Sequence, residues 1–503
     1  MAQHIYTYDC TLRDGEQCEG ISLSLDDKLR IVERLDAFGI DFIEGGFPAS
    51  NPKDIEFFRR VREMPLAHAR IAAFGSTCRK GTPADQDQGL ADLVECGAPV
   101  ATIVGKTWDA QVTRALQTTL KENLRMIADS VAYLKAHGLT VVFDAEHFFD
   151  GYKANPDYAL ACVRAASEAG ADSIDLCETN GGALPFEVEE TVGVVARALP
   201  DQQLGIHCHD DSGCAAANAL SAVRAGALQV QGTVGGIGER VGNTDLLTVI
   251  ADMELKMGLH CVGSDNLRDL TRTAQFVAET CNLSVPAHHP YTGASAFAHK
   301  GGLHASAIAR FPEAYEHTSP QNVGNATRML VSELAGKASL AAKAKSLGID
   351  LSGDARTLQA ILDDVKAREA HGYSYEVADG SLAVLLGGTS ACTSPISGWR
   401  VSASSWTIGK TRALSRRMRR ARPRSRSMWA IAGSSPRARA QAPSAHSTQR
   451  FAWPSRSTCP RWRTWSSPTT RCASWTRKAP ARALRRASSS RRAISAAAGA
   501  RSV

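Results

Sequence analysis

Several classes of protein are excluded by what this sequence lacks. No uninterrupted apolar run reaches the roughly 18 residues that a membrane-spanning helix needs. The first thirty residues contain Asp9, Asp14 and Glu16 instead of the apolar centre of a secretory signal. The thirteen cysteines are scattered and form no CxxC pair. Scattered cysteines are typical of reduced thiols, so we expect a cytoplasmic protein with no disulfide framework and no membrane partner.

Acidic residues are absent from the end of the chain. After Asp379, the remaining 124 residues contain 23 Arg and 2 Lys but no Asp or Glu, and they hold seven of the eight tryptophans. Residues 1–379 contain 33 basic and 51 acidic residues, a net charge of −18. The overall charge of +7 therefore describes neither part of the chain, and the basic end needs an explanation of its own.

A single pattern repeats through the first 260 residues. Short runs rich in Val, Ile and Phe alternate with longer segments of helical periodicity, which is typical of successive βα units. We predict eight strands, at residues 5–9, 41–44, 70–75, 99–104, 139–144, 172–177, 203–208 and 228–233. Eight strands, each followed by a helix, predict an α/β fold of the (β/α)8 TIM-barrel type. A doubly wound open sheet is the alternative, and the count of eight disfavours it.

Local signals support the predicted helices. Ser24 is a good N-cap for a helix whose Leu25, Leu29, Val32 and Leu35 share one face, and Gly39 is a good residue to end it. Further along, helical periodicity predicts helices over 214–225, 265–281 and 356–369.

Chemistry in a TIM barrel is located at the carboxyl ends of the strands, and polar residues gather there. His207 and His209 close the seventh predicted strand, and residues two apart on a strand face the same side. Two imidazoles and a carboxylate such as Asp14 suit a divalent metal, to which Asn243 could add an oxygen. The alternative is a chance pair of hydrogen-bonded histidines. The following residues, Asp210 and Asp211, either orient the imidazoles or cap the next helix.

Two long motifs resemble signatures of the α-isopropylmalate, homocitrate and citramalate synthase family. LRDGEQ at 12–17, followed by Lys28, resembles the first, while HCHDDSG at 207–213 and GGIGERVGN at 235–243 resemble the second. The resemblance extends over about residues 4–386 and is closest to the citramalate synthases, with supporting segments AFGST (73–77), GKTWD (105–109), DAEHFFDGYK (144–153), CETNGGALP (177–185) and AHKGGLHASA (298–307). Asp210 stands where the family usually has Asn, and we expect only a local adjustment there.

The resemblance implies an acyltransferase of branched-chain amino-acid biosynthesis, on the route to isoleucine. Such an enzyme joins the methyl carbon of acetyl-CoA to pyruvate and hydrolyses the thioester, giving (R)-citramalate and CoA. One alternative is a 2-isopropylmalate or homocitrate synthase that takes a larger 2-keto acid. Others are a metal-dependent acyl-CoA lyase on the same barrel, and a binding protein whose basic end sets its role.

The resemblance also implies roles for residues at the keto-acid site. A divalent ion (Mg, Mn or Zn) would be held by Asp14, His207 and His209, with Asn243 nearby. Arg13 would bind the substrate and stabilise the alkoxide that forms on the former ketone oxygen. The alternative role for Arg13 is a salt bridge with Glu44 or Glu146.

Further implied residues contact the substrates or remove the methyl proton. Glu44 and Thr179 would contact the keto acid, and Glu146 would face the substrate and help position the base or the attacking enol. His304 and Tyr315 match family positions for proton abstraction, in a segment that reaches a partner subunit. We therefore expect a homodimer. The glycine-rich stretch at 232–242 either approaches the phosphates of coenzyme A or forms tight turns.

We predict three parts: a barrel over 1–260, helical subdomains over 261–386 that complete the partner's active site, and a tail over 387–503. The tail has neither helical nor strand periodicity, and its charge predicts disorder. Its Arg, Ala, Pro, Ser and Trp are residues that GC-rich codons yield out of frame, so we favour a frameshift in place of the family's regulatory domain. The alternative is an Arg- and Trp-rich segment that binds nucleic acid, a partner that we do not expect.

Overall fold

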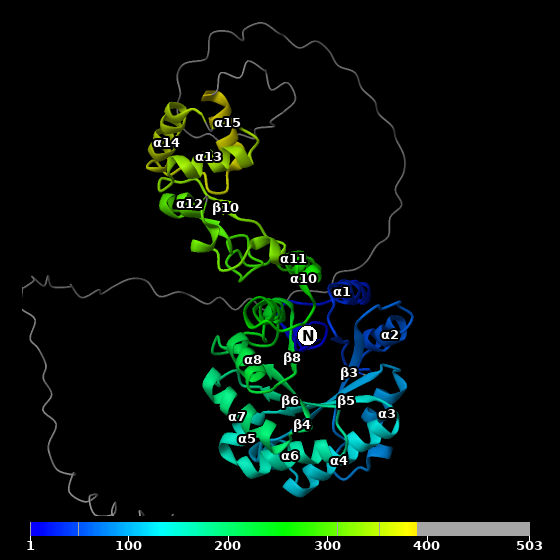
Figure 1. Ribbon diagram of the computed structural model, residues 1–503. Coiled ribbons are helices and arrows are strands. Elements are labelled where there is room, and N and C mark those ends of the chain that lie inside the picture. Colours follow the sequence, from blue (N-terminus) through cyan, green and yellow to red (C-terminus); the bar gives the residue numbers. More distant parts are fainter. Residues whose placement is uncertain (1, 49, 309, 352, 390–503) are drawn as a thin grey trace, which may run out of the picture. The chain divides into compact units, whose positions relative to one another are not determined.

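Eight parallel strands form the centre of the protein. The computed structural model describes residues 2–48, 50–308, 310–351 and 353–389. The strands pair in chain order, and β1 also pairs with β8, which closes the barrel (Figure 1). They are β1 Tyr6–Asp9, β2 Phe42–Glu44, β3 Arg70–Ser76, β4 Val100–Lys106, β5 Thr140–Glu146, β6 Ser173–Glu178, β7 Gln203–Cys208 and β8 Gln229–Gly232. The predicted TIM barrel is confirmed, with each of the eight strands at its predicted place.

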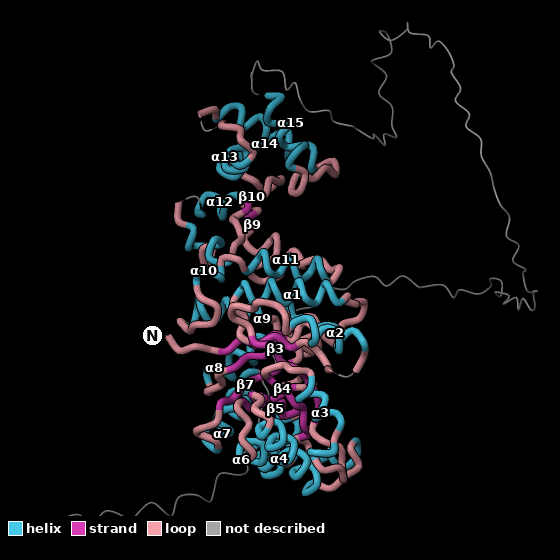
Figure 2. Tube along the Cα trace, turned by 90° about the vertical axis from the view of Figure 1, so that its right-hand side faces the viewer, coloured by secondary structure: helices cyan, strands magenta, loops and turns pink. Residues whose placement is uncertain are grey.

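Helices follow the strands and surround them, as Figure 2 shows for the barrel. The helices up to residue 260 are α1 Leu25–Phe38, α2 Pro52–Val61, α3 Gln88–Glu95, α4 Leu120–Ala136, α5 Phe148–Ala154, α6 Pro156–Glu168, α7 Pro185–Ala198, α8 Ala215–Arg224 and α9 Leu246–Asp252. The predicted ends of α1 are confirmed. Ser24 Oγ accepts a hydrogen bond from the amide of Asp27, whose carboxylate accepts one from the amide of Ser24. Gly39 ends the helix with φ of 94°, a conformation that favours glycine.

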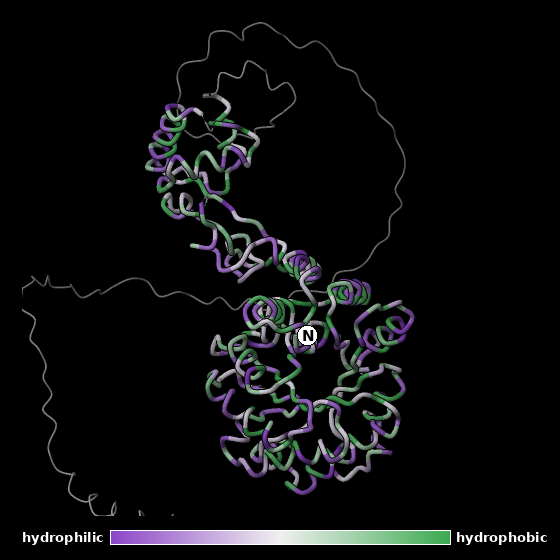
Figure 3. The backbone as a smooth tube through the Cα atoms, in the orientation of Figure 1, coloured by the Kyte–Doolittle hydropathy of each residue, from purple (hydrophilic) through white to green (hydrophobic). Residues whose placement is uncertain are grey.

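Apolar side chains between the strands and the helices form the main core of the barrel. Both hydrophobic and hydrophilic residues occur along the surrounding helices (Figure 3), as expected for helices with one buried face. The inside of the barrel is different, because it also contains buried polar residues: Tyr8, Glu44, Thr102, Asp144, Asp175, Gln229 and Gln231. Buried polar groups are costly without partners, and these side chains hydrogen-bond one another or their neighbours.

The chain after the barrel is mainly helical, with a short parallel pair of strands that the sequence did not predict. Its elements are α10 Ser264–Leu267, α11 Leu270–Thr280, β9 Ala298–His299, α12 Gly302–Ile308, β10 Arg328–Met329, α13 Lys337–Ser346, α14 Ala355–Glu369 and α15 Asp379–Thr389. The helix predicted over 265–281 is thus divided in two. Buried side chains from Cys261 to Val323 share the core of the barrel, whereas those from Val331 to Leu386 form a second core. The predicted domain boundaries stay predictions.

Three further observations bear on the sequence-based expectations. Within the described residues, no helix combines the length and the apolar character needed to cross a membrane. The ten cysteines of this part of the chain are free thiols. The disorder and the frameshift predicted for the tail concern residues that, from 390 onwards, lie outside the described ones.

Candidate active site

Three of the predicted metal ligands converge at the carboxyl end of the barrel. Asp14 follows β1, His207 lies on β7 and His209 comes directly after β7. One ligand atom from each of these residues lies within 4.8 Å of the other two, and the residues are only 3%, 5% and 7% exposed. The Nε2 atom of His207 is 3.4 Å from Asp14 Oδ2. Residues from opposite ends of the barrel sequence therefore meet because barrel closure pairs β8 with β1, and β7 is the next strand beyond β8.

The donor atoms around this cluster suit a divalent cation. Among the described residues, His209 Nδ1 and Asn243 Oδ1 are buried without a hydrogen-bond partner. A backbone bridge places Asn243 opposite His209, and its amide nitrogen donates to the carbonyl of Ile237 at 3.2 Å. The amide oxygen of Asn243 is therefore free to coordinate a metal ion. Buried atoms without partners need an explanation, and two imidazoles, a carboxylate and an amide oxygen are a suitable ligand set.

Electrostatics favour the ligand forms of Asp14 and His209. Burial alone would raise the pKa of Asp14, but the Arg13 guanidinium and the two imidazoles hold it well below its usual range. Burial, and then the neighbouring His207, lower the pKa of His209 to about 4. His209 is therefore neutral at pH 7 and can bind a metal without first losing a proton. Burial acts to lower the pKa of His207, but Asp14 outweighs it and raises that pKa.

Arg13 is held at the edge of the cluster by two carboxylates. Its Nε donates to Glu44 Oε2 at 2.6 Å, and its Nη1 lies 3.2 Å from Asp14 Oδ2. The guanidinium also lies over the Phe74 ring, 3.9 Å from its centroid. Of the two salt-bridge partners suggested by the sequence, Glu44 is the one that Arg13 contacts. The other Glu44 oxygen accepts from the Tyr8 hydroxyl at 3.0 Å, so both oxygens are engaged and a contact from Glu44 to the substrate stays a prediction.

Glu146 and Thr179 lie at the ends of β5 and β6. Glu146 forms an ion pair with Lys106, which is its register partner on β4 and a residue to which the sequence analysis assigned no role. Thr179 is half-buried, and its Oγ1 accepts from the amide of His147 at 2.9 Å. The hydroxyl proton of Thr179 remains available to a ligand. The substrate contacts predicted for these residues stay predictions.

The loops after β6, β7 and β8 are connected beside the cluster. Arg240 donates through Nε and Nη2 to the two carboxylate oxygens of Asp211, and through Nη2 to the carbonyl of Thr179 at 2.8 Å. Asp210 accepts from the amide of Ala215, so it caps α8.

In the glycine-rich stretch, a Cβ on Gly238 would clash with Asn243 Nδ2. That contact favours the tight-turn interpretation of the stretch.

Two polar residues inside the barrel, Gln231 and Asp144, had no role assigned in the sequence analysis. Gln231 Oε1 lies 2.9 Å from His207 Nδ1, and the amide nitrogen of Gln231 donates to Asp144 Oδ1 at 2.9 Å. Burial, and then the neighbouring Asp175, raise the pKa of Asp144. The available signal was the alternation of Gln229 and Gln231 on a strand whose neighbours are apolar.

His304 and Tyr315 lie on the chain after the barrel. Their rings stack with centroids 4.2 Å apart, and both residues are exposed. In the part of the chain that the structure describes, no hydrogen bond or ring contact joins this pair to Asp14, His207 or His209. One chain thus brings together the predicted metal residues and Arg13, and it leaves the predicted proton-abstracting pair exposed.

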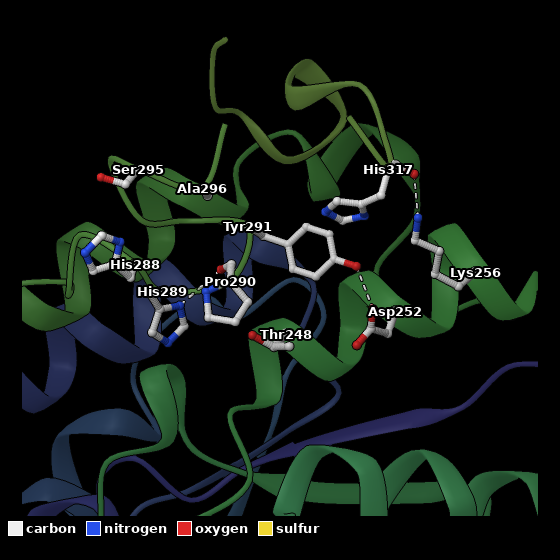
Figure 4. Close-up of a pocket in the computed structure, with 10 residues that line it drawn as sticks. All are labelled: Thr248, Asp252, Lys256, His288, His289, Pro290, Tyr291, Ser295, Ala296 and His317. Atoms are coloured by element: carbon white, nitrogen blue, oxygen red, sulfur yellow. Dashed lines mark hydrogen bonds between the residues drawn. The ribbon is translucent and has the colours of Figure 1, made fainter. Parts of the chain in front are cut away.

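A cavity of about 590 Å³ lies elsewhere, between α9 and the segment that follows α11 (Figure 4). Several of its polar side chains already bond within the protein. The Tyr291 hydroxyl donates to Asp252 at 2.6 Å, and Lys256 Nζ donates to the carbonyl of His317 at 2.6 Å. The His317 ring packs against Tyr291 and Phe297. None of the predicted site residues lines the cavity.

Comparison with known proteins identifies two matching family models and several similar proteins. A family model described as HMGL-like matches residues 4–277, and one described as homocitrate synthase post-HMGL domain-like matches residues 291–372. The (R)-citramalate synthase of Aquifex aeolicus (strain VF5) is 49% identical over 77% of this chain and 73% of its own length. That of Streptomyces coelicolor is 53% identical over 76% of this chain and 71% of its own length. Among solved structures, the HMG-CoA lyase of Bacillus subtilis is 20% identical, with a TM-score of 0.48 over 56% of this chain and 96% of that one.

Proposed function

Because the chain belongs to the citramalate synthases of the HMGL-like family, we propose that it condenses acetyl-CoA with pyruvate to give (R)-citramalate and CoA. The observation that carries this proposal is the buried cluster of Asp14, His207 and His209 beside Arg13, with the free Asn243 oxygen next to it. A keto acid presents a ketone and a carboxylate oxygen side by side, and this site offers positions for both.

The keto-acid half of the reaction depends on the cluster and on Arg13. Asp14, His207, His209 and Asn243 hold a divalent ion (Mg, Mn or Zn), which supplies Lewis acidity to the ketone when bound. Arg13 donates to the oxygen on which negative charge develops as the new carbon–carbon bond forms. Its position is prearranged by the hydrogen bond to Glu44, so little reorganisation is needed at that moment. Thr179 donates its free hydroxyl proton to the carboxylate of the keto acid.

The acetyl half requires removal of a methyl proton, and His304 with Tyr315 serves this step in a homodimer. The imidazole of one protomer accepts the proton in the barrel of its partner, and Glu146 orients the attacking carbon. The resulting enolate attacks the ketone carbon, the alkoxide is protonated, and water then cleaves the thioester to release CoA and citramalate. The metal-binding enzyme works in the cytoplasm, where acetyl-CoA and pyruvate are available.

Release of free thiol with a panel of keto acids tests the proposal. The purified chain is supplied with acetyl-CoA, Mn²⁺ and one of pyruvate, 2-ketoisovalerate or 2-ketoglutarate, and the product is identified by chiral chromatography. We expect thiol release with pyruvate and (R)-citramalate as the product, and no release from the variant Arg13→Ala. Thiol release only with a larger keto acid, or cleavage of an acyl-CoA without condensation, would replace the proposal.

A further inference from the structure

Gln231 lies directly behind one predicted metal ligand. It is fully buried on β8, and its register partner on β7 is His207. The amide oxygen of Gln231 lies 2.9 Å from His207 Nδ1, and the thiol of Cys10 is 3.9 Å from the same oxygen. Both neighbours on this side of the amide are able to donate a hydrogen.

The other side of the amide faces acceptors. The nitrogen of Gln231 donates to Asp144 Oδ1 at 2.9 Å. Asp144 and Asp175 are register partners on β5 and β6 and are 3% and 0% exposed. A rotated amide would turn its oxygen toward the two carboxyl groups and its nitrogen toward the imidazole. The imidazole and the thiol at the amide oxygen, together with Asp144 at the amide nitrogen, therefore favour this one orientation of Gln231.

This orientation determines which nitrogen of His207 holds the proton. An amide oxygen only accepts, so the Nδ1 atom of neutral His207 carries its hydrogen. The lone pair is then on Nε2, the atom that faces Asp14 Oδ2 at 3.4 Å. A ligand imidazole whose second nitrogen donates to a fixed acceptor keeps both its tautomer and its ring plane.

We propose that Gln231 is a positioning residue for the metal site, which orients His207 as an Nε2 donor and is itself held by Asp144. This inference rests on the metal site in the proposed function and adds residues that lie outside the ligand set. Both residues are buried and linked to His207 by hydrogen bonds, so we assign them a role that acts through His207.

Gln229 provides a matched comparison on the same strand. It is buried inside the barrel two residues earlier, and its amide nitrogen donates to Asp175 Oδ2 at 2.7 Å. The hydrogen bonds of Gln229 do not reach His207, for which the described structure shows Gln231 as the Nδ1 partner. Replacement of either glutamine by methionine removes an amide from the barrel interior at similar volume, but only one replacement removes the support of His207.

Manganese binding to the metal-free protein tests the proposal without any substrate. Free Mn²⁺ is measured by electron paramagnetic resonance in titrations of the wild type, Gln231→Met and Gln229→Met. We expect Gln231→Met to bind Mn²⁺ about 10- to 100-fold more weakly, which is typical for the loss of a residue that hydrogen-bonds a metal-bound histidine. Gln229→Met should bind like the wild type. Equal affinities of the wild type and Gln231→Met, or an equal loss in both variants, would overturn the proposal.

A second measurement does not depend on the glutamine variants and is made on the Zn²⁺-loaded wild type. Long-range ¹⁵N–¹H spectra of the histidine side chains, with His207 assigned by its absence in His207→Gln, identify the nitrogen that carries the proton. We expect a proton on Nδ1 of His207, and a proton on Nε2 would overturn the proposal. If the protein binds Mn²⁺ as described but forms no citramalate, the proposed substrates are wrong while the role of Gln231 stands.

Discussion

His207 and His209 are two residues apart, yet their surroundings differ. His207 Nδ1 bonds with Gln231 and His207 Nε2 faces Asp14 Oδ2 at 3.4 Å, whereas His209 Nδ1 has no partner among the described residues. The pKa of His207 is raised by Asp14, and that of His209 is lowered to about 4 by burial and by His207. One imidazole is therefore held in place by the protein, and the other is a neutral donor without a competing bond.

Removal of either imidazole should disable the site. We expect His207→Ala and His209→Ala each to lose condensation by at least about 10³-fold, because a divalent ion that loses a ligand also loses its position on the ketone. Mn²⁺ binding to the metal-free protein should weaken in parallel. His137→Ala, at the exposed end of α4, serves as the control and should match the wild type. Full activity of folded His207→Ala with His209→Ala after chelation and addition of Mn²⁺ would show that the assignment is wrong.

Between elements, Arg240 connects three of the loops that surround the site. It has φ of 59°, in the left-handed region that a residue with a side chain seldom adopts. The hydrogen bonds to Asp211 and to the carbonyl of Thr179 compensate for that conformation. The loop after β8 therefore stays in contact with the loops after β6 and β7, and Thr179 and Asn243 lie at the two ends of this connection.

A double-mutant cycle measures this connection. Arg240→Ala and Asp211→Ala should each lower kcat/KM about tenfold, which corresponds to roughly 1.4 kcal/mol. The double variant should lose little more than either single variant, because both changes break the same pair. Glu239→Ala is the control, since Glu239 is 3.9 Å from Arg240 and more exposed than Asp211. Additive losses in the double variant would contradict the connection.

At the scale of the whole molecule, His304 and Tyr315 are a stacked and exposed pair, which the proposed function assigns to the barrel of a partner subunit. If the pair acts in the barrel of a partner, two inactive variants should restore one another. In a heterodimer of His207→Ala and His304→Ala, isolated with two affinity tags, one of the two active sites keeps both histidines. The other active site lacks both. We expect about half of the wild-type kcat per dimer, since the dimer has two equivalent sites.

Two other results would count against this arrangement. Either homodimer alone should be inactive, which provides the control for the mixed dimer. A heterodimer as inactive as its parents would place the proton-abstracting residue within the same chain, where Glu146 is the next candidate. Monomeric enzyme with full activity would have the same consequence.

The end of the second core predicts where the chain can be shortened. Leu382 and Leu386 of α15 are fully buried against α14 and its neighbours. A chain that ends at residue 389 keeps both leucines, so we expect it to retain the melting temperature and the condensation rate of the full chain. A chain that ends at residue 378 loses both, and burial of a leucine stabilises by about 1.5–3 kcal/mol, so its second core should melt at a lower temperature. Differential scanning calorimetry distinguishes the two, and equal melting of both truncated chains would contradict the prediction.

Much of the fold could be predicted from the sequence because its signals are local. Strand residues of β4 and β5 are nearly continuous apolar runs, and Ser24 and Gly39 mark the ends of α1 by their own backbone preferences. The spacing of His207 and His209 also predicts one shared direction, because side chains alternate along a strand. A property that depends on a few neighbouring residues can be read without tertiary structure.

Other features were decided only by the tertiary structure. Gln231 meets His207 across 24 residues of sequence and Asp144 across 87, so no local pattern shows that one amide serves both. Arg13 selects Glu44 over Glu146 as its partner because Glu44 lies on β2, the strand that pairs with β1. The pattern of hydrophobic residues in the sequence thus determined the order of strands and helices that forms the barrel. The orientation of each buried polar group depended on which donors and acceptors barrel closure placed around it, because such a group is stable only when its partners surround it in space.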